Sequence, residues 1–429
     1  MPRPPFQKIL IANRGEIALR IIRACHELGV RAVAVYSDAD AGALWARAAD
    51  EAYPLPGNTA AETYLNSGRI LGIAAECGAE AIHPGYGFLS ENAGFAAACA
   101  GQGIVFIGPS PEAMHALGSK AAARALAEAN SVPVVPGVDG AGKSDEELVR
   151  AAESIGFPVL IKASAGGGGK GMRVAASAGE LLDGLRAARS EALSSFGDDH
   201  VLLERYFTEI HHVEVQVLGD THGKLLHLYE RECSIQRRHQ KIIEESPSPV
   251  VGDNDALREA ITGAAVRLAR AAGYTNAGTV EFIVNSSGDF YFLEMNTRLQ
   301  VEHPVTEALT GLDLVHWQMC IAAGEALPLS QPDIPRRGHA IECRVYAEDP
   351  ATGFLPSIGE IEAYVRPAGP GIRVDDGLES GAAVSPYYDP MLAKVITWGM
   401  DRGDAIRKMD RALRETLLLG VTTNIDYLR

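Results

Sequence analysis

The feature that most constrains the fold is a predicted β-hairpin that leads into a run of charged and amide side chains. Residues 279–284 and residues 290–294 show strand patterns, and the segment between them is rich in turn-forming residues. If the turn residues are 287–288, the register places Glu281 directly opposite Glu294. Two carboxylates facing each other across a strand pair repel one another, so this register predicts a cationic partner.

The residues after the hairpin add further groups that suit phosphoryl transfer. Asn296 follows Glu294 by two positions, so it adds a neutral oxygen to the same strand face. Mg²⁺ favours few protein oxygens and takes its remaining ligands from water and phosphate. Arg298 adds a fixed cation and Glu302 a spare carboxylate. The set predicts a magnesium site at Glu281, Glu294 and Asn296 beside a phosphoryl-transfer centre, and a polar strand edge with surface salt bridges is the simpler interpretation.

Length and composition indicate a globular protein of several domains. The 429 residues correspond to about three domains. The net charge of −16, with no basic tract, argues against nucleic acid or an anionic membrane as a partner. The six cysteines form no CxxC pair, which favours reduced thiols over disulfides or a zinc site. With no long apolar run and no room for a signal peptide before the first strand, we expect a soluble, cytoplasmic protein.

The N-terminal region predicts a βαβ unit. Residues 8–12 and 31–36 are short apolar strands, and residues 16–28 between them show helical spacing that ends at Gly29. This order is typical of a doubly wound parallel sheet. The first turn, residues 13–16, lacks the GxGxxG pattern, so dinucleotide binding is not supported there.

Three later segments precede the centre of the chain, and their roles are not fixed by their patterns alone. HPGYGFLSEN at residues 83–92 follows a short strand and suits either a shaped ligand loop or a tight structural turn. Residues 111–130 predict one alanine-rich helix that carries Lys120, which by itself indicates a solvated helix charge. The proline-rich residues 132–137 mark a domain boundary.

A glycine run near the centre of the chain predicts a flap between two strands. Residues 159–163 form an apolar strand that carries Lys162, and residues 172–174 suit a second strand. The glycines between them do not match the GxxxxGK[ST] pattern of a P-loop. Their bare amides can close over phosphates, as in the kinase glycine loop, with Lys162 as a phosphate contact, and a flexible linker is the alternative.

The segment of residues 230–246 concentrates cations in an otherwise acidic chain. It follows predicted strands at residues 201–207 and 211–217, where His211 and His212 are better suited to contact a ligand or solvent than a metal. A local cationic cluster is a candidate anion site, and a solvated charged loop is the alternative. The cluster comprises Arg231, Arg237, Arg238, His239 and Lys241 around Gln236, with Glu244 and Glu245 beside them.

Five long strings, in this order, resemble the biotin carboxylase family within the wider ATP-grasp fold. They are IANRGEIA at 11–18, HPGYGFLSEN at 83–92, the glycine flap at 162–172, SIQRRHQK at 234–241 and EMNTRLQVEHPVTE at 294–307. The resemblance covers nearly the whole chain. It implies an α/β (α+β) ATP-grasp fold with an N-terminal doubly wound parallel-sheet domain (1–115), a helical linker (116–133), a mobile glycine-flap lid (134–203), a catalytic core (204–335) and a C-terminal mixed-sheet domain (336–429).

The resemblance also implies a role for each matched residue. ATP would be bound by Lys120, Lys162, Glu204, His212, Gln236 and His239, and the flap of Gly166, Gly167, Gly168 and Gly169 with Met172 would cover the phosphates. Mg²⁺ or Mn²⁺ would be held by Glu281, Glu294 and Asn296. Bicarbonate would be positioned by Lys241, Arg298, Gln300 and Val301, with Glu302 as its base. Arg298 would also stabilise the biotin enolate, and Arg344 with Tyr86 would meet the biotin ureido group or the departing phosphate.

The implied activity is a half-reaction that needs partners. ATP would phosphorylate bicarbonate to carboxyphosphate. Carboxyphosphate would then release carbon dioxide, which biotin captures. The chain has no Ala-Met-Lys-Met string for attaching biotin and no room for a carboxyltransferase domain. We therefore expect a biotin carboxyl carrier domain and a carboxyltransferase subunit, either as separate chains or as downstream domains that this sequence lacks. The resemblance further implies a homodimer, and the segment of residues 317–329 resembles the α subunits of acyl-CoA carboxylases.

Three other functions compete with this interpretation. A different ATP-grasp ligase would form an acyl phosphate from another carboxylic acid, which Gln300, Glu302 and Arg344 disfavour. A catalytically silent assembly subunit is disfavoured by the full set of charged site residues. A nicotinamide oxidoreductase is disfavoured by the missing glycine fingerprint.

Overall fold

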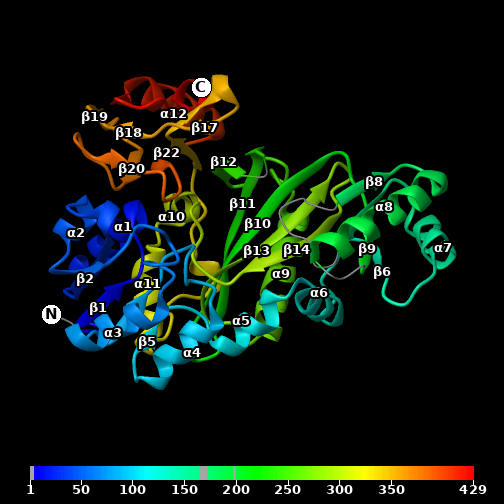
Figure 1. The fold of residues 1–429 in the computed structure, drawn as a ribbon, viewed down its shortest axis with the longest axis horizontal. Coiled ribbons are helices and arrows are strands. Elements are labelled where there is room, and N and C mark those ends of the chain that lie inside the picture. The colour runs from blue at the N-terminus through cyan, green and yellow to red at the C-terminus, as the bar shows by residue number, and fades with distance from the viewer. Residues whose placement is uncertain (1–3, 164–171, 197–199, 239) are drawn as a thin grey trace. The chain divides into compact units, whose positions relative to one another are not determined.

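The structure is a computed structural model that describes residues 4–163, 172–196, 200–238 and 240–429 (Figure 1). The chain forms two compact units. The first combines Met1–Val132, His211–Phe282 and Glu294–Arg429, and the second combines Pro133–Ile210 and Ile283–Leu293. Each unit therefore contains segments that lie far apart in the sequence.

The first unit begins with the predicted doubly wound sheet. Its five strands are parallel and lie in the order β3-β2-β1-β4-β5. Strands such as β1 are continuous apolar runs, and they are buried because helices cover the sheet. The strands are β1 (Lys8–Ile11), β2 (Arg31–Ser37), β3 (Glu51–Leu55), β4 (Ala81–His83) and β5 (Val105–Phe106), and the helices are α1 (Gly15–Glu27), α2 (Leu44–Ala48), α3 (Ser67–Cys77) and α4 (Ala93–Gly101).

The single helix predicted for residues 111–130 is wrong, because two helices occupy this segment. They are α5 (Pro111–Gly118) and α6 (Lys120–Ala129). Ser119 separates them with an extended backbone, and its hydroxyl accepts a hydrogen bond from the Ala122 amide. A serine in this role caps a new helix, so the alanine-rich periodicity concealed the break.

An eight-stranded sheet has the order β14-β13-β10-β11-β12-β15-β22-β20, and its strands from β11 to β20 belong to the first unit. The paired strands from β10 to β20 along this order are antiparallel, and α10 packs against β11, β12 and β15. The strands are β10 (Ile210–Gly219), β11 (Leu225–Arg237), β12 (Gln240–Ser246), β13 (Asn276–Asn285), β14 (Phe290–Asn296), β15 (His339–Tyr346), β20 (Ile372–Asp376) and β22 (Met391–Gly399), with helices α9 (Asp255–Ala271), α10 (His303–Thr310), α11 (Leu314–Ala322) and α12 (Arg402–Glu415).

The turn between β13 and β14 differs from the predicted one. The Gly288 amide donates to the Asn285 carbonyl (3.0 Å), and the Asn285 amide donates to the Asp289 carbonyl (2.9 Å). This pattern makes a three-residue loop, with glycine at the position that requires a positive φ (85°). The two-residue turn expected at residues 287–288 is therefore wrong, while the opposition of Glu281 and Glu294 stays a prediction.

The second unit contains a four-stranded antiparallel sheet in the order β6-β9-β7-β8. β7 and β8 pair as the predicted strand–loop–strand element requires, while Gly166 to Gly169 lie outside the described residues. The elements are β6 (Gly137–Asp139), β7 (Val159–Ala163), β8 (Met172–Ala175), β9 (Val201–Arg205), α7 (Asp145–Ile155) and α8 (Ala178–Phe196).

Short strands complete the C-terminal part of the first unit. The helix α12 ends at Glu415, because residues 417–419 pair with residues 363–365 as a strand. No helix in the described part of the chain combines the length and apolar composition needed to cross a bilayer. The remaining elements are β16 (Glu348–Asp349), β17 (Leu355–Pro356), β18 (Gly359–Glu360), β19 (Ala363–Val365), β21 (Ala383–Val384), β23 (Leu417–Leu419), α13 (Ile425–Leu428) and the 3₁₀ turns Asp38–Asp40, Gln331–Asp333 and Pro350–Thr352.

Candidate active site

Lys241 on β12 is the centre of a buried charge cluster. Its Nζ lies 2.6 Å from Glu214 Oε2, 2.9 Å from Glu281 Oε1 and 2.8 Å from Glu302 Oε1. Burial lowers the pKa of Lys241, but the carboxylates outweigh it and raise the pKa well above its ordinary value. Lys241 is therefore a permanent cation shared by three acids.

Glu302 has a cation at each of its two carboxylate oxygens. Lys241 contacts Oε1, and the Arg344 Nη2 donates to Oε2 (3.0 Å). Burial raises the pKa of Glu302, but Lys241 and Arg344 outweigh it and bring the pKa well below its ordinary value. Glu302 is therefore a carboxylate that is free of its proton at neutral pH, as a proton acceptor must be.

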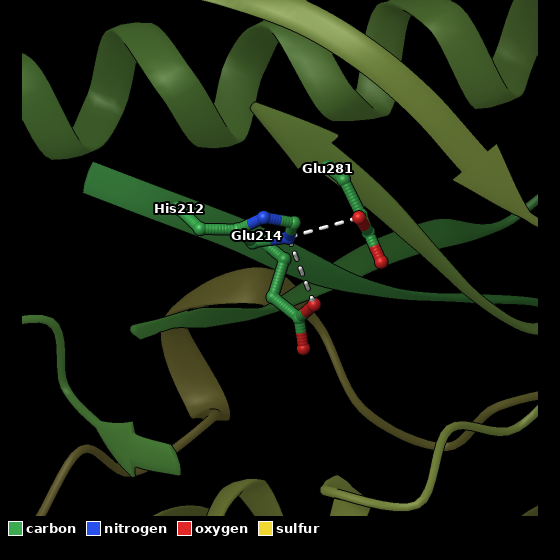
Figure 2. Close-up of side chains that lie close together, drawn as sticks. All are labelled: His212, Glu214 and Glu281. Carbon is green, nitrogen blue, oxygen red and sulfur yellow. Dashed lines mark ion pairs between the residues drawn. The ribbon is translucent and has the colours of Figure 1, made fainter. Parts of the chain in front are cut away.

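Glu281 is surrounded by donors from three parts of the chain. The Asn296 amide nitrogen donates to its Oε1 (2.7 Å) and so does the Gln300 amide nitrogen (2.8 Å), while His212 Nε2 lies 2.8 Å from its Oε2. Burial raises the pKa of Glu281, but Lys241 and His212 outweigh this and bring the pKa below its ordinary value. Figure 2 shows His212 between Glu281 and Glu214, the latter 3.8 Å away.

The predicted metal ligands are only partly brought together. Glu281 and Asn296 are adjacent, and an anionic carboxylate with an amide oxygen is a donor pair that Mg²⁺ favours. The Asn296 nitrogen faces Glu281, and its oxygen accepts from Arg298. Glu294 is 41% exposed and lies 3.7 Å from Lys120 Nζ instead. The donor chemistry of Glu281 and Asn296 thus fits the ion, and Glu294 faces a lysine that the resemblance assigns to ATP.

Arg298 is oriented by a residue that the sequence analysis missed. Its Nε donates to Glu91 Oε2 (3.0 Å) and its Nη2 donates to Asn296 Oδ1 (3.0 Å), while Glu91 Oε1 accepts from the Thr297 amide (3.0 Å). Glu91 belongs to the HPGYGFLSEN string. The string therefore contacts the end of β14, and its glutamate was the available signal.

A buried lysine supports the loop that carries Val301. Lys394 on β22 is fully buried, donates to the Val301 carbonyl (2.9 Å) and lies 3.1 Å from Glu16 Oε1. The hydroxyl of Tyr86 also donates to Glu16. The sequence analysis missed Lys394 too, although a lysine within an otherwise apolar strand is a signal that could have identified it.

Three described cations of the cationic segment, Arg231, Arg237 and Lys241, form ion pairs with carboxylates. Arg231 is fully buried, contacts Glu214 Oε1 (2.5 Å) and donates to Gln300 Oε1 (3.2 Å). Arg237 donates to Glu348 (2.6 Å). Of the cluster members that the structure describes, Lys241 is the one that contacts Glu281 and Glu302, whereas Arg231 holds the neighbouring acids and amides in place.

A cavity of about 500 Å³ opens beside this cluster. Among its lining residues are four of the predicted ones, namely Tyr86, Arg298, Val301 and Arg344. Aromatic and cationic groups together suit a small polar ring or a small anion. This cavity and the Lys241 cluster are joined by Arg344, which also contacts Glu302.

The other predicted residues are dispersed. Gln236 donates to the Cys233 carbonyl (2.8 Å), and in the second unit Lys162 forms an ion pair with Glu204. Met172 lies opposite Lys162 in the β7–β8 register and is 41% exposed. His239 and the flap glycines Gly166, Gly167, Gly168 and Gly169 lie outside the described residues.

Three family descriptions match successive parts of the chain. Residues 5–114 match the biotin carboxylase N-terminal domain, residues 119–330 match the ATP-binding domain of the carbamoyl-phosphate synthase L chain, and residues 342–429 match the biotin carboxylase C-terminal domain. The chain is 52% identical over 424 residues to a biotin carboxylase of Halalkalibacterium halodurans, covering 99% of this chain and 93% of that one. It is also 52% identical over 426 residues to the propionyl-CoA carboxylase alpha chain of Sus scrofa, covering 99% of this chain and 58% of that one.

Solved structures resemble the chain over almost its full length. The biotin carboxylase domain dimer of 2-oxoglutarate carboxylase from Hydrogenobacter thermophilus, in complex with MgADP, ADP and bicarbonate, has a TM-score of 0.89 and 50% identity and covers 98% of this chain and 92% of that one. A biotin carboxylase complex from Campylobacter jejuni has a TM-score of 0.91 and 46% identity and covers 98% and 94%.

Proposed function

This chain belongs to the biotin carboxylase family, and on that premise we propose that it catalyses the ATP-dependent carboxylation of biotin by bicarbonate. It is thus an ATP-dependent ligase with an ATP-grasp fold. The observation that carries this function is Glu302, a buried carboxylate held between Lys241 and Arg344. The products are ADP, phosphate and carboxybiotin.

The site residues act first on bicarbonate. Bicarbonate attacks the γ-phosphorus of ATP and forms carboxyphosphate, with ADP as the leaving group. Glu302 accepts the proton of bicarbonate, and Lys241 and Arg298 bind its oxygens, with Gln300 and Val301 beside them. Fixed cations in a buried site stabilise developing negative charge strongly, since they need no rearrangement. The contacts of Arg298 with Glu91 and Asn296 hold its guanidinium in one orientation for this purpose.

The second stage uses the cavity beside the cluster. Carboxyphosphate breaks down to carbon dioxide and phosphate, the phosphate removes the proton from biotin N1, and the resulting enolate attacks carbon dioxide. Tyr86 and Arg344 line the cavity where the ureido ring would bind, and Arg298 would stabilise the enolate. Lys394 fixes Val301, which also lines this cavity.

Glu281, Glu294 and Asn296 would hold Mg²⁺ or Mn²⁺. When bound, the ion supplies positive charge that offsets the charge of the ATP phosphates. Glu281 is kept anionic by Lys241 and His212, so it is ready to act as a ligand at neutral pH. Lys120 lies near Glu294, which supports a place for both at the phosphates.

ATP would be bound by Lys120, Lys162, Glu204, His212, Gln236 and His239, under the flap of Gly166, Gly167, Gly168, Gly169 and Met172. The ion pair between Lys162 and Glu204 supports this assignment in the second unit, because it orients the lysine before the nucleotide arrives. The proposed domains are the ranges 1–115, 116–133, 134–203, 204–335 and 336–429.

The acceptor of the carboxyl group would be biotin on a carrier protein, and a carboxyltransferase subunit would consume carboxybiotin. The related alpha chain of propionyl-CoA carboxylase supports such partners, because this chain spans only 58% of its length. The dimer of the related Hydrogenobacter thermophilus domain supports a homodimer.

ADP release tests the function. Purified protein with MgATP should release ADP strongly only when bicarbonate and free biotin are both present. Release that depends on bicarbonate but ignores biotin would indicate another ATP-grasp ligase. No release under any condition would indicate a catalytically silent assembly protein.

A further inference from the structure

Two fully buried glutamates face each other beside the proposed site. Glu244 on β12 pairs directly with Glu342 on β15 in the antiparallel register, and both side chains are 0% exposed. Among the described residues, neither oxygen of Glu342 nor Oε2 of Glu244 has a hydrogen-bond partner. A buried carboxylate without partners is costly when ionised, so at least one of the two must hold a proton.

The charged groups around this pair decide which acid holds the proton. Arg344 donates through Nε to Glu244 Oε1 (2.6 Å), whereas Glu342 has no such contact within the described chain. The other charged groups that act on the pair are Lys241 from β12, Lys394 from β22 and the Glu302 carboxylate at the start of α10.

Burial and neighbouring charge set the two acids apart. Burial raises the pKa of Glu244 to about 7, with Arg344 limiting the rise. Burial raises the pKa of Glu342 well above its ordinary value, and the negative charge of Glu244 adds to this. Glu342, whose two oxygens have no partner in the described chain, is therefore the acid that holds the proton, while Glu244 changes charge near pH 7.

Arg344 connects this pair to the reaction. Its Nε contacts Glu244 and its Nη2 contacts Glu302, so one guanidinium joins two carboxylates. An ionised Glu244 holds Arg344 at Nε, beside the Nη2 that contacts Glu302. Glu244 remains as a counter-ion when Glu302 becomes neutral on accepting a proton. A protonated Glu244 would hold the guanidinium less firmly.

We propose that Glu244 is a positioning residue for Arg344, and that its ionisation controls how well biotin is used. Glu342 is the neutral neighbour that makes an ionised Glu244 tolerable in the core. The inference rests on the proposed function, because it assigns Arg344 to biotin. It adds a residue to which the resemblance gives no role, and a pH dependence for the biotin stage.

The test compares the Glu244→Gln and Glu342→Gln variants across pH. We expect kcat/KM for biotin in the unaltered protein to fall as the pH drops through about 7. Glu244→Gln should abolish this acid limb and raise KM for biotin by roughly tenfold, which corresponds to about one pKa unit of lost interaction. Glu342→Gln should keep the limb, since it replaces a neutral acid with a neutral amide.

Two further measurements separate the possible failures. Thermal unfolding shows whether each variant folds, and Glu244→Asp, which keeps an ionisable group, should retain an acid limb if the glutamine variant does not fold. An unchanged acid limb in Glu244→Gln would overturn the role of Glu244 alone. Absence of biotin-dependent ADP release in the unaltered protein would overturn the proposed function, and the role of Glu244 with it.

Discussion

The Nζ of Lys241 lies 2.8 Å from the Oε1 of Glu302, inside a cluster where Glu214 and Glu281 contact the same ammonium. This pair places a proton acceptor directly beside a fixed cation. The acceptor is ionised because Lys241 and Arg344 outweigh the effect of burial on its pKa. In the proposed reaction, activation of bicarbonate depends on this arrangement, since it needs both a base and a positive contact.

Replacing Glu302 should affect catalysis far more than ATP binding. In Glu302→Gln the amide cannot accept the bicarbonate proton, so kcat should fall by roughly 10²- to 10⁴-fold. KM for ATP should change little, because Glu302 contacts Lys241 and Arg344. Steady-state ADP release and ATP titration measure both, with the exposed Glu362→Gln as a matched control. Equal losses in rate and in ATP affinity would contradict the role.

Lys394 should be important for stability as well as for the loop at Val301. Lys394→Met leaves Glu16 buried without its cation, so the free energy of unfolding should fall by about 3 kcal/mol or more. Adding Glu16→Gln should restore part of this loss, because the orphaned charge is removed. Urea unfolding of the single and double variants checks the coupling. Strictly additive losses would show that the two residues do not interact.

Glu244 should also make the free energy of unfolding depend on pH. Its folded pKa of about 7 is above the ordinary value of 4.5, so its contribution to stability is fully present below about 4.5 and is lost as the pH rises to about 7. Relative to Glu244→Gln, the unaltered protein should therefore lose on the order of 3 kcal/mol of unfolding free energy across this window. Denaturant unfolding at several pH values measures the difference. A constant difference between the two proteins would mean that Glu244 does not titrate there.

Replacing Glu91 should raise KM for bicarbonate modestly. Glu91→Gln weakens the contact with Arg298 Nε, and Glu91 is 42% exposed, so solvent limits the effect. KM for bicarbonate should rise by about three- to fivefold, with KM for ATP unchanged. Initial rates at varied bicarbonate measure this shift. A loss confined to ATP affinity would place Glu91 in a different role.

Those parts of the molecule whose signals are local were predicted from the sequence. The βαβ unit at the N-terminus and the strands on both sides of the glycine run follow from apolar periodicity, and the structure contains them. The break at Ser119 and the three-residue turn at Gly288 were mispredicted because capping and turn hydrogen bonds depend on individual side chains. These errors change where a helix is interrupted and how long a turn is, but they leave the order of the elements intact.

Some site residues were not predicted from the sequence for a different reason. Glu91, Lys394 and Glu342 contact or face partners that come from segments far away in the chain. Strand order cannot be deduced from periodicity alone, so neither could these contacts. By contrast, Lys241, Glu281 and Glu302 were identified through their place in the family strings and the hairpin pattern, and the fold brings Lys241 into contact with both acids.

Carboxybiotin itself can be detected as the product. Purified protein would be incubated with radiolabelled bicarbonate, MgATP and free biotin, and label bound to biotin would be separated from free bicarbonate. We expect labelled biotin that requires ATP and disappears in Glu302→Gln. ATP consumption without any labelled biotin, or equal labelling by Glu302→Gln, would contradict biotin carboxylation with Glu302 as the base.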